Sequence, residues 1–79
     1  MPEFVYESGP VYRQRITLQQ AQQIALSRVP GQIVHVDMEM ERGVLVYEIF
    51  ILTPQNRIYE VEVSARTGAI LKIELENDD

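Results

Sequence analysis

The chain has 79 residues, of which 46% are hydrophobic, and it carries 12 acidic against 7 basic side chains. A chain of this length buries enough surface for one small core and for no second domain. The formal charge of −5 argues against nucleic-acid binding, which depends on Lys and Arg neutralising phosphates, and it disfavours docking on an anionic membrane. The absence of cysteine excludes disulfides, thiol nucleophiles and Cys-based zinc sites.

The first 15 residues carry three aromatic side chains and a break at Ser8-Gly9-Pro10. We expect residues 1–15 to form a weakly ordered arm or an extra edge strand. The beginning of the chain lacks the basic region and the apolar core of a signal peptide, and no apolar run is long enough to cross a bilayer. We therefore expect no signal peptide and no membrane span in this segment, although one could be removed from a longer precursor.

A helix is predicted over residues 17–29. Thr17 and Gln20 have the spacing of a capping box. Apolar residues then recur every three or four positions, which places them on one face: Leu18, Ala21, Ile24, Ala25 and Val29. The helix should end at Pro30-Gly31, because proline cannot continue the hydrogen-bond ladder and glycine tolerates the conformation that ends helices.

Four strands are predicted after the helix, because apolar and polar residues alternate there. Their ranges are residues 33–41, 44–52, 57–64 and 69–75. The second strand is apolar on both sides and should be central; Met38 and Met40 of the first should fill the core. Consecutive antiparallel strands form a meander, whose apolar face only the helix can cover. The sequence thus predicts a two-layer α+β domain over residues 16–76 and a frayed tail at residues 77–79.

Acidic side chains concentrate in the predicted sheet. Residues 1–31 contain two acids and three arginines, a balance of +1, whereas residues 32–79 contain ten acids and four basic residues, a balance of −6. The acids fall on the polar positions of the strands, so we expect them on the sheet face away from the helix. The candidate binding residues are Asp37, Glu39, Glu41, Glu48, Glu60 and Glu62.

Three interpretations of this acidic surface remain open. It can be a solvated face that keeps the domain soluble and discourages edge pairing, or a docking surface for a basic partner. It can also bind calcium or a similar hard cation, although such ions need about six to eight oxygens that these strands do not obviously bring together. We predict no metal site and no cofactor, and we expect His35 to be exposed beside Asp37.

No set of residues with catalytic spacing is present. His35 is the only histidine, the three serines show no spacing that would pair them with it, and no glycine-rich phosphate loop occurs. We predict that the protein is not an enzyme.

The order of elements and several short segments resemble the PepSY domain. The resemblance covers about residues 16–74, and its segments are Ile16–Ala21, Ala25–Leu26, Val29–Gly31, Glu39, Val46–Ile49, Tyr59–Val63 and Ala65–Ile70. Family members commonly have an aspartate just before the Ala-x-Thr-Gly turn, where this chain has Ser64. We expect the Ser64 hydroxyl to accept a turn amide in its place.

The resemblance implies a non-catalytic, protein-binding module of the bacterial cell envelope that regulates or inhibits a peptidase. PepSY domains occur in propeptides of thermolysin-type metallopeptidases and in exported or membrane-anchored bacterial proteins, so an extracytoplasmic location is implied; a cytoplasmic one stays open. The expected partner is a protein, with no nucleic acid and no membrane contact by this segment. The expected oligomeric state is a monomer or a weak homodimer. The alternatives to this function are a structural domain that self-associates through its N-terminal arm and a cation-binding acidic sheet.

Overall fold

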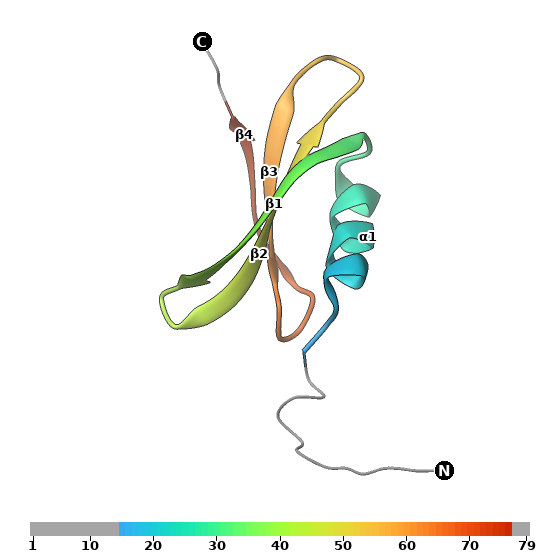
Figure 1. Ribbon diagram of the computed structural model, residues 1–79. Coiled ribbons are helices and arrows are strands. Elements are labelled where there is room, and N and C mark those ends of the chain that lie inside the picture. Colours follow the sequence, from blue (N-terminus) through green and yellow to red (C-terminus); the bar gives the residue numbers. More distant parts are fainter. Residues whose placement is uncertain (1–14, 77–79) are drawn as a thin grey trace, which may run out of the picture.

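The computed structural model describes residues 15–76. The elements follow in the order α1 (Leu18–Arg28), β1 (Gln32–Glu41), β2 (Val44–Leu52), β3 (Ile58–Ser64) and β4 (Ile70–Glu76). The strands form one antiparallel sheet in the order β1-β2-β3-β4, and α1 lies on one side of it (Figure 1). The predicted two-layer α+β architecture is confirmed. The predicted N-terminal arm, apart from Arg15, and the predicted frayed tail lie outside the described residues.

The capping box predicted at the start of α1 is present. The Gln20 amide donates to the Thr17 hydroxyl at 3.0 Å, and the Thr17 amide donates to the Gln20 side-chain oxygen at 2.9 Å. At the other end the chain turns directly into β1 and passes close to β2. A Cβ atom at Gly31 would collide with the Leu52 carbonyl oxygen and would lie 2.8 Å from Cγ2 of Ile51, so the connection needs glycine there.

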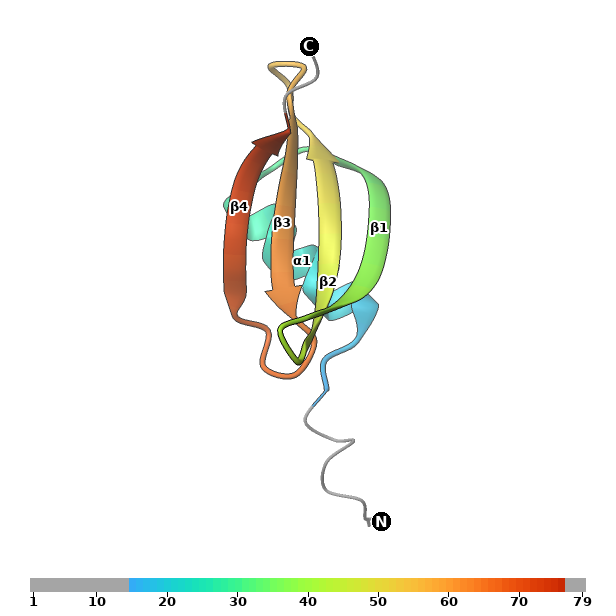
Figure 2. The same cartoon turned by 90° about the vertical axis from the view of Figure 1, so that its left-hand side faces the viewer.

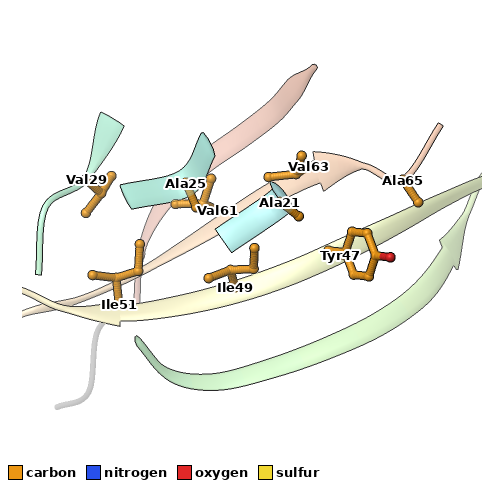
Figure 3. Close-up of a cluster of buried hydrophobic side chains, with 9 residues drawn as sticks. All are labelled: Ala21, Ala25, Val29, Tyr47, Ile49, Ile51, Val61, Val63 and Ala65. Atoms are coloured by element: carbon orange, nitrogen blue, oxygen red, sulfur yellow. The ribbon is translucent and has the colours of Figure 1, made fainter. Parts of the chain in front are cut away.

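The core lies between α1 and the two central strands, β2 and β3 (Figure 3). Ala21 and Ala25 are completely buried, and their small side chains allow the helix to approach the sheet closely. They pack on Ile49 and Ile51 of β2 and on neighbouring residues of the cluster: Val29, Tyr47, Val61, Val63 and Ala65. The Tyr47 hydroxyl donates to the Ile16 carbonyl at 3.2 Å, which ties the start of the helix to the sheet.

The prediction that Met38 and Met40 fill the core is wrong. Their exposed fractions are 48% and 64%. Both lie on the helix side of the sheet, opposite Tyr47 and Leu45. However, β1 is an edge strand, and the helix contacts mainly β2 and β3. A single helix is too narrow to cover four strands, since a helix with its side chains is about 10–12 Å wide and strands lie about 4.8 Å apart. Leu18, at the exposed start of α1, also lies outside the core.

Two shifts of strand register change which side chains face the helix. In β1 the shift between Ile33 and His35 puts Ile33 opposite Ile51 and leaves Val34, which a strict alternation would place beside Met38 and Met40, 46% exposed. A one-residue bulge reverses the side-chain alternation beyond it, which a strict period of two cannot anticipate.

The second shift lies between β3 and β4. Val63 pairs with Ile70, whereas Glu62 pairs with Lys72, so Leu71 is the extra residue. A strict alternation would place Leu71 on the same side of the sheet as Ile73; instead Leu71 lines a hollow together with Glu62 and Lys72. Leu71 therefore contributes to the face of the sheet away from the helix, and Ile70 takes its place toward the helix.

Candidate functional site

The face of the sheet opposite α1 is covered by no other element of residues 15–76 (Figure 2). The strand register places Asp37 opposite Glu48, Glu48 opposite Glu62 and Glu62 opposite Lys72. One row across the sheet thus reads acid, acid, acid, lysine. We call this surface the acidic face and define it by the six candidate residues: Asp37, Glu39, Glu41, Glu48, Glu60 and Glu62.

Half of the acidic face is buried. Glu48, Glu60 and Glu62 are each only 8% exposed, whereas Asp37 and Glu39 on the edge strand are exposed. The three buried residues belong to β2 and β3, whose side chains have neighbours on both sides. Accordingly, Val46 is fully buried, although it is paired with Glu39 and Ser64 on this face. The prediction that β2 is a central strand is confirmed.

The carboxylates of the acidic face fall into groups whose oxygens all lie within 4.8 Å of one another. The groups are Asp37 with Glu39 and Glu48; Glu41 with Glu48 and Glu62; and Glu60 with Glu74 and Glu76. The structure brings five of the six candidate residues together around Glu48. Glu60 instead lies with two acids of β4.

Burial raises the pKa of Glu48 above its usual range, and the negative charges of Glu39, Glu62, Glu41 and Asp37 raise it further. No hydrogen bond or ion pair joins the Glu48 carboxylate to another residue between 15 and 76. Glu48 therefore has acidic neighbours and no cationic partner within this range.

The pKa of Glu60 is raised to about 7, mainly because burial disfavours the carboxylate; nearby Lys72 opposes this effect, and Glu48, Glu62 and Glu76 add to it. A carboxyl group with this pKa exchanges its proton near neutral pH. The charge of the acidic face therefore depends on pH in the physiological range.

Lys72 is the basic side chain at the β4 end of the acid row. Its Nζ lies 3.1 Å from Glu74 Oε1 and 3.4 Å from Glu62 Oε2. The hydrogen bond to Glu74, followed by the charges of Glu60 and Glu62, raises the pKa of Lys72 above its usual range. Lys72 is not among the six residues predicted for the site. Its polar position beside Glu74 is visible in the sequence, but its pairing with Glu62 depends on the bulged register.

A hollow at one end of the open face combines acidic, basic and apolar walls. It is lined by Glu41, Arg42, Val44, Glu62, Leu71 and Lys72. The Arg42-Gly43 turn that forms its edge has positive φ values of 52° and 83°, as expected for the two-residue hairpin turn that fits the twist of strands. The hollow already contains two cationic side chains, which distinguishes it from the Asp37 end of the face.

The remaining predicted features take structural roles. His35 is exposed, its Nε2 lies 3.1 Å from Asp37 Oδ2, and its ring centroid lies 5.5 Å from that of Phe50. The Ser64 hydroxyl accepts hydrogen bonds from the amides of Arg66 and Thr67, both at 3.2 Å. The expectation that Ser64 supports the turn is confirmed.

Comparison with known proteins agrees with this architecture. The family described as "Peptidase propeptide and YPEB domain" (PepSY) matches residues 15–74. The protein YkoJ of Bacillus subtilis (strain 168) is 34% identical over 62 residues, which cover 78% of this chain and 36% of YkoJ. A crystal structure of a candidate lipoprotein from Clostridium difficile 630 matches with a TM-score of 0.75 and 30% identity, over 80% of this chain and 41% of that chain.

This chain therefore spans well under half the length of either relative. No helix within residues 15–76 has the length and apolar character needed to cross a membrane. The helix-on-meander architecture, the match over residues 15–74 and the 34% identity to YkoJ lead to one conclusion. The chain belongs to the PepSY family.

Proposed function

We propose that this PepSY domain is a non-catalytic, protein-binding module whose acidic face binds a basic segment of a partner protein. The observation that supports it best is the uncovered sheet face, on which Glu48 and Glu62 lie buried and directly opposite each other. Like charges placed opposite each other destabilise a sheet. The α1 side of the sheet already provides the core, so the fold has no need of acids at these positions.

Lys or Arg side chains of a partner would relieve this repulsion. They would supply the opposite charge that Glu48 lacks among residues 15–76, and complementary charge also raises the rate of encounter. The exposed carboxylates of Asp37 and Glu39 lie at the rim and are available for the first contact. A basic segment lying across β1 and β2 would then reach the buried Glu48.

We further propose that the partner is a peptidase outside the cytoplasm and that binding inhibits it. The family description refers to peptidase propeptides, and the structural neighbour is described as a candidate lipoprotein, which supports a place in the cell envelope.

The test mixes the purified chain with secreted metallopeptidases from its own source and measures complex formation and residual peptidase activity. We expect a complex that weakens as salt rises, together with reduced activity. The variant Glu39→Gln/Glu41→Gln removes two charges from the rim of the acidic face. It should weaken binding by about threefold to tenfold, as rim charges do.

The matched control is Gln19→Lys/Gln23→Lys, which changes the net charge by the same amount at two exposed positions of α1. The control should bind as the wild type does. Equal loss in both variants would show that net charge alone drives association, and absence of any complex or inhibition would reject the peptidase role.

A further inference from the structure

Glu48 is the buried member of the carboxylate group at the β1 end of the acidic face. Glu48 is 8% exposed, and no hydrogen bond or ion pair joins it to another residue between 15 and 76. Burying a charge without a partner costs several kcal/mol, and proteins usually avoid this cost by pairing the group, protonating it or binding a metal ion. A buried acid that points into a group of further acids favours the third solution.

The side chains around Glu48 have a suitable arrangement for an ion. One oxygen from each of Asp37, Glu39 and Glu48 lies within 4.8 Å of the other two. Three atoms at this spacing can all lie within about 2.8 Å of a common point, close to the roughly 2.3–2.6 Å of calcium–oxygen bonds. Small rotations of the two exposed side chains, Asp37 and Glu39, would bring their oxygens from this distance to the length of a calcium–oxygen bond.

The other two carboxylate groups are less suitable for binding a cation, because basic side chains already lie beside them. In the group of Glu41, Glu48 and Glu62, the Glu62 carboxylate lies 3.4 Å from Lys72 Nζ, and Arg42 lines the same hollow. Lys72 also lies 3.1 Å from Glu74, which belongs to the third group.

The group at the β1 end has no Lys or Arg partner within residues 15–76. Its one basic neighbour is His35, whose Nε2 lies 3.1 Å from Asp37 Oδ2. One Asp37 oxygen and both oxygens of Glu39 and of Glu48 remain without a partner in that range. Because β1 is an edge strand and two of the three acids are exposed, an ion can enter from solvent and keep part of its water shell.

We propose that Asp37, Glu39 and Glu48 bind one hard divalent cation, with Ca²⁺ as the preferred ion. With one Asp37 oxygen paired to His35, the three carboxylates offer the remaining Asp37 oxygen and both oxygens of Glu39 and of Glu48, and water completes the coordination of about six to eight that Ca²⁺ adopts. Mg²⁺ fits less well, because it demands regular octahedral geometry at about 2.0–2.1 Å, which flexible side chains on a sheet surface do not impose.

The test is a calorimetric titration of the metal-free full chain with CaCl₂ and, separately, with MgCl₂. We expect saturable binding of one Ca²⁺ with a dissociation constant of about 0.1–1 mM, typical of weak sites, and weaker binding of Mg²⁺. Manganese(II) added in trace amounts should broaden the NMR signals of Asp37, Glu39 and Glu48 first. This readout locates the ion independently of its affinity.

The critical variant is Glu48→Gln, and Glu76→Gln is its matched control. Both remove one negative charge from the same face, but Glu76 belongs to a different carboxylate group. Glu48→Gln should fold, because it replaces a buried charge by a neutral group of the same shape. It should weaken Ca²⁺ binding at least about tenfold, since affinity depends on the number of charged ligands, whereas Glu76→Gln should change it less than about twofold.

Equal loss in both variants would overturn the proposal, because it would show that Ca²⁺ only screens the acidic face. Absence of saturable binding up to about 10 mM, well above the range of weak sites, would overturn it as well. The titration contains no partner protein, so its outcome is separate from that of the docking test; because both proposals use Glu48, Ca²⁺ and a basic segment would compete for this carboxylate.

Discussion

Replacing Glu60 with glutamine should stabilise the protein at neutral pH and leave its stability nearly unchanged in mild acid. Glu60 is 8% exposed and lies opposite Phe50 and Glu74 on the open face of the sheet. Glutamine has the shape of the protonated glutamic acid but carries no charge. The substitution therefore removes the cost of burying the carboxylate while keeping its packing.

The magnitude follows from the two pKa values. The pKa of Glu60 is about 7 in the folded protein against 4.5 for the free side chain, so the folded state binds the proton more tightly. Stability therefore falls as the pH rises from about 4.5 to about 7, and the whole cost is present above that range. The difference corresponds to at most about 3 kcal/mol. Because the carboxylate lies close to solvent that screens it, we expect a gain of about 1–2 kcal/mol at pH 8.

The assay is urea unfolding of the wild type and of Glu60→Gln at intervals between pH 4 and pH 8. The measured quantity is the difference between their free energies of unfolding, which should be close to zero near pH 4 and should reach its full value above pH 7. An NMR titration of the Glu60 carboxyl carbon should show a midpoint near pH 7. A stability difference that is constant over this pH range, or a titration midpoint near 4.5, would refute the reasoning.

Three further substitutions test separate contacts. Gly31→Ala should cost about 1–3 kcal/mol in urea unfolding, because the added Cβ collides with the Leu52 carbonyl; an unchanged midpoint would show that the loop relaxes freely. Thr17→Ala should cost about 1 kcal/mol by removing the 3.0 Å cap of α1, and equal stability would contradict a role for this cap. Lys72→Met should raise the pKa of Glu60 further, since Lys72 lowers it; an NMR midpoint that stays or falls would contradict this contact.

Local chemistry made the elements of this fold predictable. The Thr17–Gln20 capping box, the Pro30-Gly31 stop and the Arg42-Gly43 turn all act within a few residues. Each depends on backbone hydrogen bonds or on allowed backbone angles, which a short segment determines largely by itself. The same applies to the Ser64 hydroxyl, which binds amides only two and three residues further along the chain.

Side-chain burial was predicted less well, because it depends on which strands the helix covers. Met38 and Met40 follow the alternation of inward residues and are nevertheless exposed, since β1 lies at the edge of the sheet. Leu71 follows the same alternation and faces the other way, because a bulge shifts the β3–β4 register. A bulge leaves no clear signal in a pattern of period two. The predicted meander implies that β1 is an edge strand, but the alternation does not show how far one helix reaches across the sheet.

The acidic face shows the same division. Alternation alone assigns the six acids to the polar side of the strands. Their role in binding a partner stays a prediction. The sequence could not separate the exposed Asp37 and Glu39 from the buried Glu48, Glu60 and Glu62. That difference arises from strand order, because side chains on central strands are covered by neighbours on both sides.

The sequence by itself determined the element order, the turns, the PepSY resemblance and the excess of negative charge in the sheet, because these depend on residues close together in the chain. Only the tertiary structure decided that Asp37, Glu48, Glu62 and Lys72 form one row and that Glu48 is buried without a partner among residues 15–76. The physical reason is that cross-strand register and strand position set the distances between charges and their access to water. These two quantities determine the pKa values of the acids and the ligands that the face can bind.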